Sequence, residues 1–84
     1  MISVRQMKAA RALLAWSQGD LAAASGISEP TIARLESTDG PVGGRAETAQ
    51  ALVVALEKAG VEFIPENGGG AGVRLAKRGK RIKT

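Results

Sequence analysis

The chain has 84 residues, with no cysteine, no histidine and no tyrosine, one tryptophan and one phenylalanine. This length allows one small domain. The missing side chains exclude disulfides, thiol nucleophiles, imidazole bases and zinc sites built from Cys or His, and the scarcity of aromatic rings argues against recognition of stacked RNA bases. No apolar run approaches the roughly 20 residues that span a bilayer, and no signal-peptide core is present, so we expect a cytoplasmic protein without membrane contact.

The formal charge of +4 is concentrated near the C-terminus. Five of the twelve basic residues lie in residues 77–84, which contain no acidic residue. The seven basic and eight acidic residues of residues 1–76 nearly cancel. Net charge therefore does not by itself indicate that the folded part binds nucleic acid. Residues 77–84 are expected to be a basic, flexible tail that either stays solvated or contacts phosphate.

Residues 3–26 predict two helices. Residues 3–15 are rich in strong helix formers, carry apolar residues at helical spacing, and have Ser3 as a cap at their start. A shorter helix follows Ser17, whose hydroxyl can cap it, and ends at Gly26, which adopts left-handed turns readily. The two segments therefore form consecutive helices joined by a short connection.

Two further helices are predicted after this turn. Residues 28–36 form the third, with Ser28 as its cap and Pro30 in the first turn, where a missing N–H has no intrahelical partner. A loop rich in glycine precedes the fourth helix, which is expected over residues 45–59 with Gly60 as its stop signal.

The spacing of apolar residues changes from helical to alternating after Gly60. Residues 61–64 and 72–76 alternate around a glycine-rich connection, which predicts a β-hairpin. An isolated hairpin of this size is marginally stable in water, so it must pack on the helices or on another chain. We expect residues 61–76 to be a dimerisation element; the alternative is a hairpin folded back on the helices of its own chain. The expected apolar face comprises Val61, Phe63, Val73 and Leu75.

Two short helices around a tight turn form a rigid pair that projects its second helix outwards, and an α-helix fits the roughly 12 Å wide major groove of DNA. The segment Gln18-Gly-Asp-Leu-Ala-Ala-Ala-Ser-Gly-Ile-Ser-Glu-Pro-Thr-Ile-Ala-Arg-Leu-Glu36 resembles the helix-turn-helix of the XRE family, the Cro and phage-repressor type. The resemblance covers roughly residues 3–59. It implies a mainly α, lambda-repressor-like DNA-binding domain of four to five helices in residues 1–60, followed by the two-stranded β-hairpin.

The resemblance also implies which residues face the bases. Arg34 can donate to O6 and N7 of guanine, and Glu29 can accept from the amino group of cytosine. Arg34 can instead bind phosphate, and Glu29 can simply favour a helix dipole. Pro30 offers only apolar contact, so few side chains of this helix can hydrogen-bond to base edges. Recognition of DNA shape then contributes more to specificity. The implied base-facing residues are Ser28, Glu29, Pro30, Ala33 and Arg34.

Phosphate contacts and one structural ion pair follow from the same resemblance. Gln18 is expected to cap the second helix and to touch the DNA backbone. An arginine of the first helix in this family often pairs with a glutamate that ends the third, which implies an ion pair between Arg11 and Glu36; two unrelated surface charges are the alternative. The implied phosphate contacts are Ser17, Gln18, Thr31 and Arg45.

These inferences predict a regulator of transcription that binds double-stranded DNA sequence-specifically, as a repressor and homodimer on a palindromic operator, associated with the nucleoid. The alternative is an antitoxin that binds a partner toxin and represses its own operon. We expect no enzyme, no metal and no cofactor. The glycines of residues 68–72 lack the Gly-Lys-Ser/Thr ending of a phosphate loop, and the carboxylates show no acid–base pairing.

Overall fold

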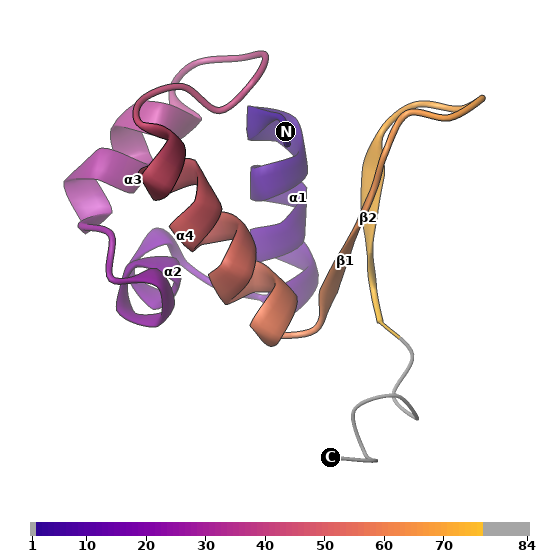
Figure 1. The fold of residues 1–84 in the computed structure, drawn as a ribbon. Helices are drawn as coiled ribbons and strands as arrows, with labels where there is room; N and C mark the ends of the chain where they lie inside the picture. The colour runs from indigo at the N-terminus through magenta and orange to yellow at the C-terminus, as the bar shows by residue number, and fades with distance from the viewer. Residues whose placement is uncertain (1, 77–84) are drawn as a thin grey trace.

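The computed structural model describes residues 2–76; Met1 and residues 77–84, where the basic tail was expected, lie outside the described residues. Four helices precede a two-stranded antiparallel hairpin, as predicted (Figure 1). No fifth helix forms within residues 2–76. The elements are α1 (Val4–Leu14), α2 (Gln18–Ser25), α3 (Glu29–Glu36), α4 (Ala46–Lys58), β1 (Val61–Ile64) and β2 (Gly72–Leu75).

Serine caps fix the starts of the first three helices. The Ser3 hydroxyl accepts from the N–H of Gln6, and the Gln6 side chain accepts in return from the N–H of Ser3. Ser17 and Asp20 form the same reciprocal capping box at α2. Ser28 caps α3 without the reciprocal bond. These are local interactions between residues three apart, which is why the predicted helix starts agree closely with the observed ones.

The four helices enclose one apolar core. α2 packs against both α3 and α4, and α1 packs against α3. The turn from α2 to α3 passes through Gly26, whose φ of 78° lies in the left-handed region and whose N–H donates to the carbonyl of Ala22. This packing holds α2 and α3 as one rigid unit. The largest fully buried side chains are Val4, Met7, Leu21, Ile32, Leu52 and Leu56.

The loop between α3 and α4 is attached to the start of the chain. The N–H of Val4 donates to the carbonyl of Gly40 at 2.8 Å, and the N–H of Val42 donates to the carbonyl of Ile2 at 3.2 Å. Ser3 and Pro41 form an isolated antiparallel bridge beside these bonds. A loop that its composition marked as irregular is therefore held by backbone hydrogen bonds close to where α4 begins.

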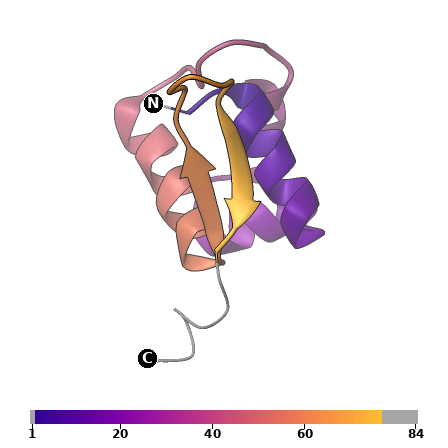
Figure 2. The same ribbon diagram turned by 90° about the vertical axis from the view of Figure 1, so that its right-hand side faces the viewer.

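The hairpin covers one side of the helices. Val61 lies opposite Leu75 and Phe63 opposite Val73 in the strand register, so these four side chains share a face, and that face meets α1 and α4 (Figure 2). Val61 is 3% exposed, and Phe63 and Val73 pack against the core, whereas Leu75 is 51% exposed. Val61 is therefore not available to a second chain, whereas Phe63, Val73 and Leu75 keep part of their surface exposed, and their role in dimerisation stays a prediction. Two strands alone cannot bury such a face, and here the chain's own helices cover it.

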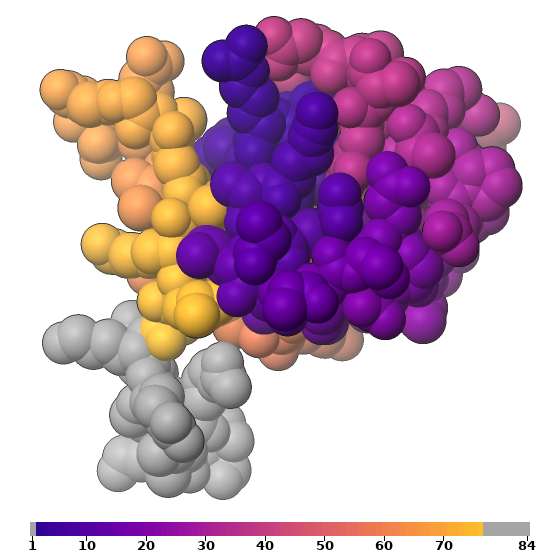
Figure 3. Space-filling view, turned by 180° about the vertical axis from the view of Figure 1, so that it is seen from behind, coloured from indigo at the N-terminus to yellow at the C-terminus, as the bar shows by residue number. Residues whose placement is uncertain are grey.

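Gln6 fastens the hairpin to the start of α1. Its side-chain Nε2 donates to the carbonyl of Gly72 at 3.0 Å and to that of Ile64 at 3.4 Å, at the end of the strands next to the turn. Its Oε1 accepts from the N–H of Ser3 at 2.9 Å. The tip of the hairpin beyond this point stands clear of the helices (Figure 3). One buried amide thus joins α1 to both strands, and residues 61–76 share a core with the helical part.

No helix within residues 2–76 is long and apolar enough to cross a membrane.

Candidate nucleic-acid interface

The residues predicted to face bases lie on the exposed side of α3. Ile32 and Leu35 turn the opposite side of this helix into the core. Neither Glu29 nor Arg34 is covered by the rest of the described chain. Figure 1 places α3 and the hairpin on opposite sides of the bundle, with α4 between them. The exposed set comprises Ser28, Glu29, Pro30, Ala33 and Arg34.

Arg34 borders a small hollow between α3 and the start of α4. The hollow has a volume of about 260 Å³, and no carboxylate of the described residues lines it. Arg45 is the cap residue of α4 and makes no side-chain cap bond, so the positive end of the α4 dipole adds to the two guanidinium charges. These donors suit an anion such as a backbone phosphate. The lining residues are Thr31, Arg34, Leu35, Gly44, Arg45 and Thr48.

Thr48 is a lining residue that sequence reasoning missed. It lies three positions after Arg45, a spacing that places two side chains on the same face of a helix. That spacing was the available signal, but it could not show that α3 would approach this face.

Arg11, Glu36 and Gln18 form a hydrogen-bonded cluster where α1, α2 and α3 meet. Arg11 binds the Glu36 carboxylate through two bonds, from Nε to Oε2 at 2.8 Å and from Nη2 to Oε1 at 2.7 Å. Gln18 Nε2 donates to Oε1 of the same carboxylate at 2.9 Å. Arg11 Nη1 also donates to the carbonyl of Trp16, just before α2, at 2.9 Å. The cluster therefore connects the end of α3 to both preceding helices.

Gln18 differs from its expected role. Ser17 is the cap of α2, so Gln18 is the first helical residue and not the cap. Its amide is oriented by Glu36, because a buried carboxylate takes up a nearby donor. Ser28 and Thr31, two other expected DNA contacts, are bonded to each other through their hydroxyls at 2.9 Å.

The carboxylate of Glu29 leans over the start of α2. A Cβ atom built on Gly19 would lie 3.4 Å from Oε1 of Glu29 and 3.6 Å from the hydroxyl of Ser17. The start of a helix carries a partial positive charge that favours a carboxylate. The carboxylate of Glu29 therefore interacts favourably with the dipole of α2 as well as with that of its own helix. Its negative charge sits beside Ser17, one of the expected phosphate contacts.

Residues 7–41 match the helix-turn-helix family HTH_3. The matched stretch runs from α1 through the turn at Gly26 to the loop after α3, and it contains the Arg11–Glu36 pair. Residues 7–41 are an XRE-family helix-turn-helix domain. This confirms the resemblance seen in the sequence. An XRE-family domain implies DNA binding and regulation of transcription, and the family typically has no catalytic activity. No curated protein matches the chain significantly.

The helix-turn-helix holds the side chain of Glu36 ionised where α1, α2 and α3 meet. Burial alone raises the pKa of this carboxyl, but the hydrogen bonds from Arg11 and Gln18, together with the charge of Arg11, lower the pKa below its usual value. A group whose pKa is lower in the folded chain stabilises the fold when it is ionised, at pH values above its unfolded pKa. That stability is lost as the pH falls through the folded pKa.

We therefore expect the free energy of unfolding to decrease as the pH falls below the usual carboxyl range, and part of this decrease to be absent in Glu36→Gln. Urea unfolding of both proteins at a series of pH values measures the difference. The pKa of Asp39 is also lowered, chiefly by the N–H of Gly40 and then by Arg5. Because Asp39 is present in both proteins, its contribution cancels in the difference between their pH profiles. Parallel pH profiles for the two proteins would show that the cluster does not stabilise the folded state through this charge.

Proposed function

We propose that the protein is a transcriptional repressor that binds a palindromic DNA operator as a homodimer, with α3 in the major groove. The observation that carries this proposal is the exposed side of α3, which presents Glu29 and Arg34 on a helix held rigidly by the core. The matched helix-turn-helix family supports DNA as the class of ligand. Selection of bound fragments from random DNA tests the proposal directly, because it reports binding, sequence preference and half-site symmetry together.

Phosphate contacts on both sides of α3 would set its position in the groove. Ser17 lies at the start of α2 on one side. The hollow with Arg45 and Thr31 lies on the other side, and its donors face no carboxylate of the described residues. Such contacts carry affinity and salt dependence but little sequence information. Direct readout is then left to the few exposed polar side chains of α3, chiefly Arg34.

Arg34→Ala should weaken binding to the selected operator by about 1–3 kcal/mol and relax the preference at one base pair, if Arg34 donates to guanine. Lys58→Ala is the matched control, because Lys58 is an exposed basic residue in the last turn of α4. Fluorescence anisotropy with the operator and with single-base variants measures both effects. A loss of equal size on every sequence would mean that Arg34 contacts phosphate only.

Glu29→Gln should strengthen binding to unrelated DNA more than binding to the operator. The variant removes a negative charge from the start of α2, where a phosphate is expected, and it leaves only a neutral amide oxygen to accept from cytosine. The dissociation constant for unrelated DNA divided by that for the operator is therefore expected to fall. Glu57→Gln is the control, because it makes the same charge change at an exposed residue near the C-terminal end of α4. An unchanged ratio would contradict a role for Glu29 in specificity.

Dimerisation follows from the length of DNA that one helix can read. One recognition helix reads one half-site, and symmetric operators place two half-sites about 34–36 Å apart. Leu75 on the hairpin is 51% exposed, and the hairpin lies across the bundle from α3 (Figure 1), so an interface there leaves the proposed DNA surface free. We place the dimer contact at this end of β2.

Leu75→Glu should convert a dimer into a monomer in sedimentation equilibrium, because it places a charge in the proposed contact. Val54→Glu is the control, since Val54 is an apolar residue of α4 that is 36% exposed. Dimers of equal stability for both variants would exclude Leu75 from the interface. A monomeric wild-type chain, with or without operator DNA, would contradict the homodimer itself.

A further inference from the structure

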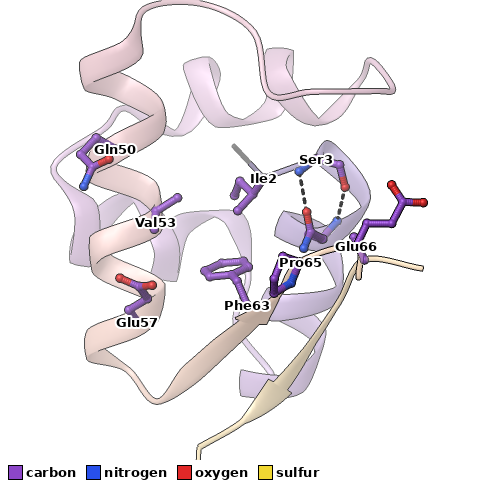
Figure 4. Close-up of a pocket in the computed structure, with 10 residues that line it drawn as sticks. Ile2, Ser3, Gln50, Val53, Glu57, Phe63, Pro65 and Glu66 are labelled. Atoms are coloured by element: carbon purple, nitrogen blue, oxygen red, sulfur yellow. Dashed lines mark hydrogen bonds between the residues drawn. The ribbon is translucent and has the colours of Figure 1, made fainter. Parts of the chain in front are cut away.

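An open groove lies between α4 and the hairpin. Its volume is about 580 Å³, within the usual range of ligand sites of roughly 300–1,000 Å³. The start of the chain closes its third side. Figure 4 shows the apolar side chains grouped at its centre and the polar ones around them. The apolar group comprises Ile2, Val53, Phe63 and Pro65.

The apolar part of the groove is held in place by the core. Ile2 is 8% exposed and belongs to the core, and Val53 and Phe63 pack against it while keeping part of their surface in the groove. These side chains cannot turn away without disturbing the core packing. The groove is therefore formed before any ligand binds, and the half-buried ring of Phe63 offers an aromatic surface.

The only charged residues among the described residues that line the groove are two glutamates, Glu57 and Glu66; its other polar residues are neutral. Glu57 and Gln50 extend from α4 along one wall, and the carboxylate of Glu66 lies at the opposite rim (Figure 4). No lysine or arginine of the described residues lines the groove. An anion is therefore disfavoured here. A bare metal ion is also disfavoured, because no group of three or more Asp or Glu side chains in residues 2–76 could hold one.

We propose that this groove binds a small organic cation with an apolar body, of which an arylalkyl ammonium is the simplest form. The ring of the ligand stacks on Phe63 and contacts Val53. Its ammonium group donates to the carboxylate of Glu57 and to the amide oxygen of Gln50, which lie on the same wall. The site is separate from α3, so this binding does not depend on the proposed DNA recognition.

Titration of the full isotope-labelled chain with phenethylammonium, followed by backbone amide shifts in NMR spectra, tests the proposal. We expect saturable shifts at Val53 and Phe63. Two comparison ligands separate the contributions: 3-phenylpropionate has the same ring and the opposite charge, and n-butylammonium has the same charge and no ring. Both should bind more weakly than phenethylammonium.

Two variants at the wall residues and one control variant outside the groove test the proposed contacts. Glu57→Gln should weaken binding by about two- to fivefold, the usual size for loss of an exposed ion pair. Glu47→Gln on the same helix lies outside the groove and should leave binding unchanged. Gln50→Glu adds a carboxylate to the wall and should strengthen binding. All three residues are exposed, so the fold should be retained.

The proposal is wrong if phenethylammonium gives no saturable shifts, if 3-phenylpropionate binds equally well, or if Glu57→Gln and Glu47→Gln behave alike. It is also wrong if the shifts at Val53 and Phe63 depend on protein concentration without ligand, because a second copy of the chain would then occupy the groove.

Discussion

The direction in which α3 points depends on the pairing of Arg11 with Glu36. The Glu36 side chain is only 4% exposed, and two short bonds from the guanidinium hold it. A carboxylate buried to this extent is tolerated only with its cation, so loss of one partner destabilises far more than the intact pair contributes. Rotation of α3 about its axis would break these bonds. Together with the buried Ile32 and Leu35, the pair keeps Glu29 and Arg34 on the outer side of the helix.

The apolar face of the hairpin packs mainly on the helices of its own chain. Val61 and Phe63 join the core of the helices, and Gln6 fixes the strands next to the turn. What remains for other molecules is the exposed end at Leu75 and the groove beside α4. Both are separated from α3 by the bundle (Figure 1), so contacts at the hairpin and contacts with DNA need not compete.

Charge in this protein is organised by surface and not by the total over the chain. The described residues nearly balance in sign, yet Arg34 and Arg45 meet at one hollow while Glu57 and Glu66 border a groove on another face. A ligand responds mainly to the charges within about 10 Å, the Debye length near 0.1 M salt, because salt screens more distant charges. Two surfaces of opposite preference can therefore exist on one small domain.

The sequence by itself determined the helices, the turn and the family, because these depend on neighbours within a few residues. The cap at Ser17 and the left-handed turn at Gly26 are examples, and both act within their own segment. Apart from the pairing of Arg11 with Glu36, which the family resemblance implied, only the tertiary structure decided which distant groups meet. The amide of Gln18 bonds to Glu36, and Thr48 joins the hollow of Arg34. Such contacts require α1, α2, α3 and α4 to be placed in space, and no local spacing encodes that placement.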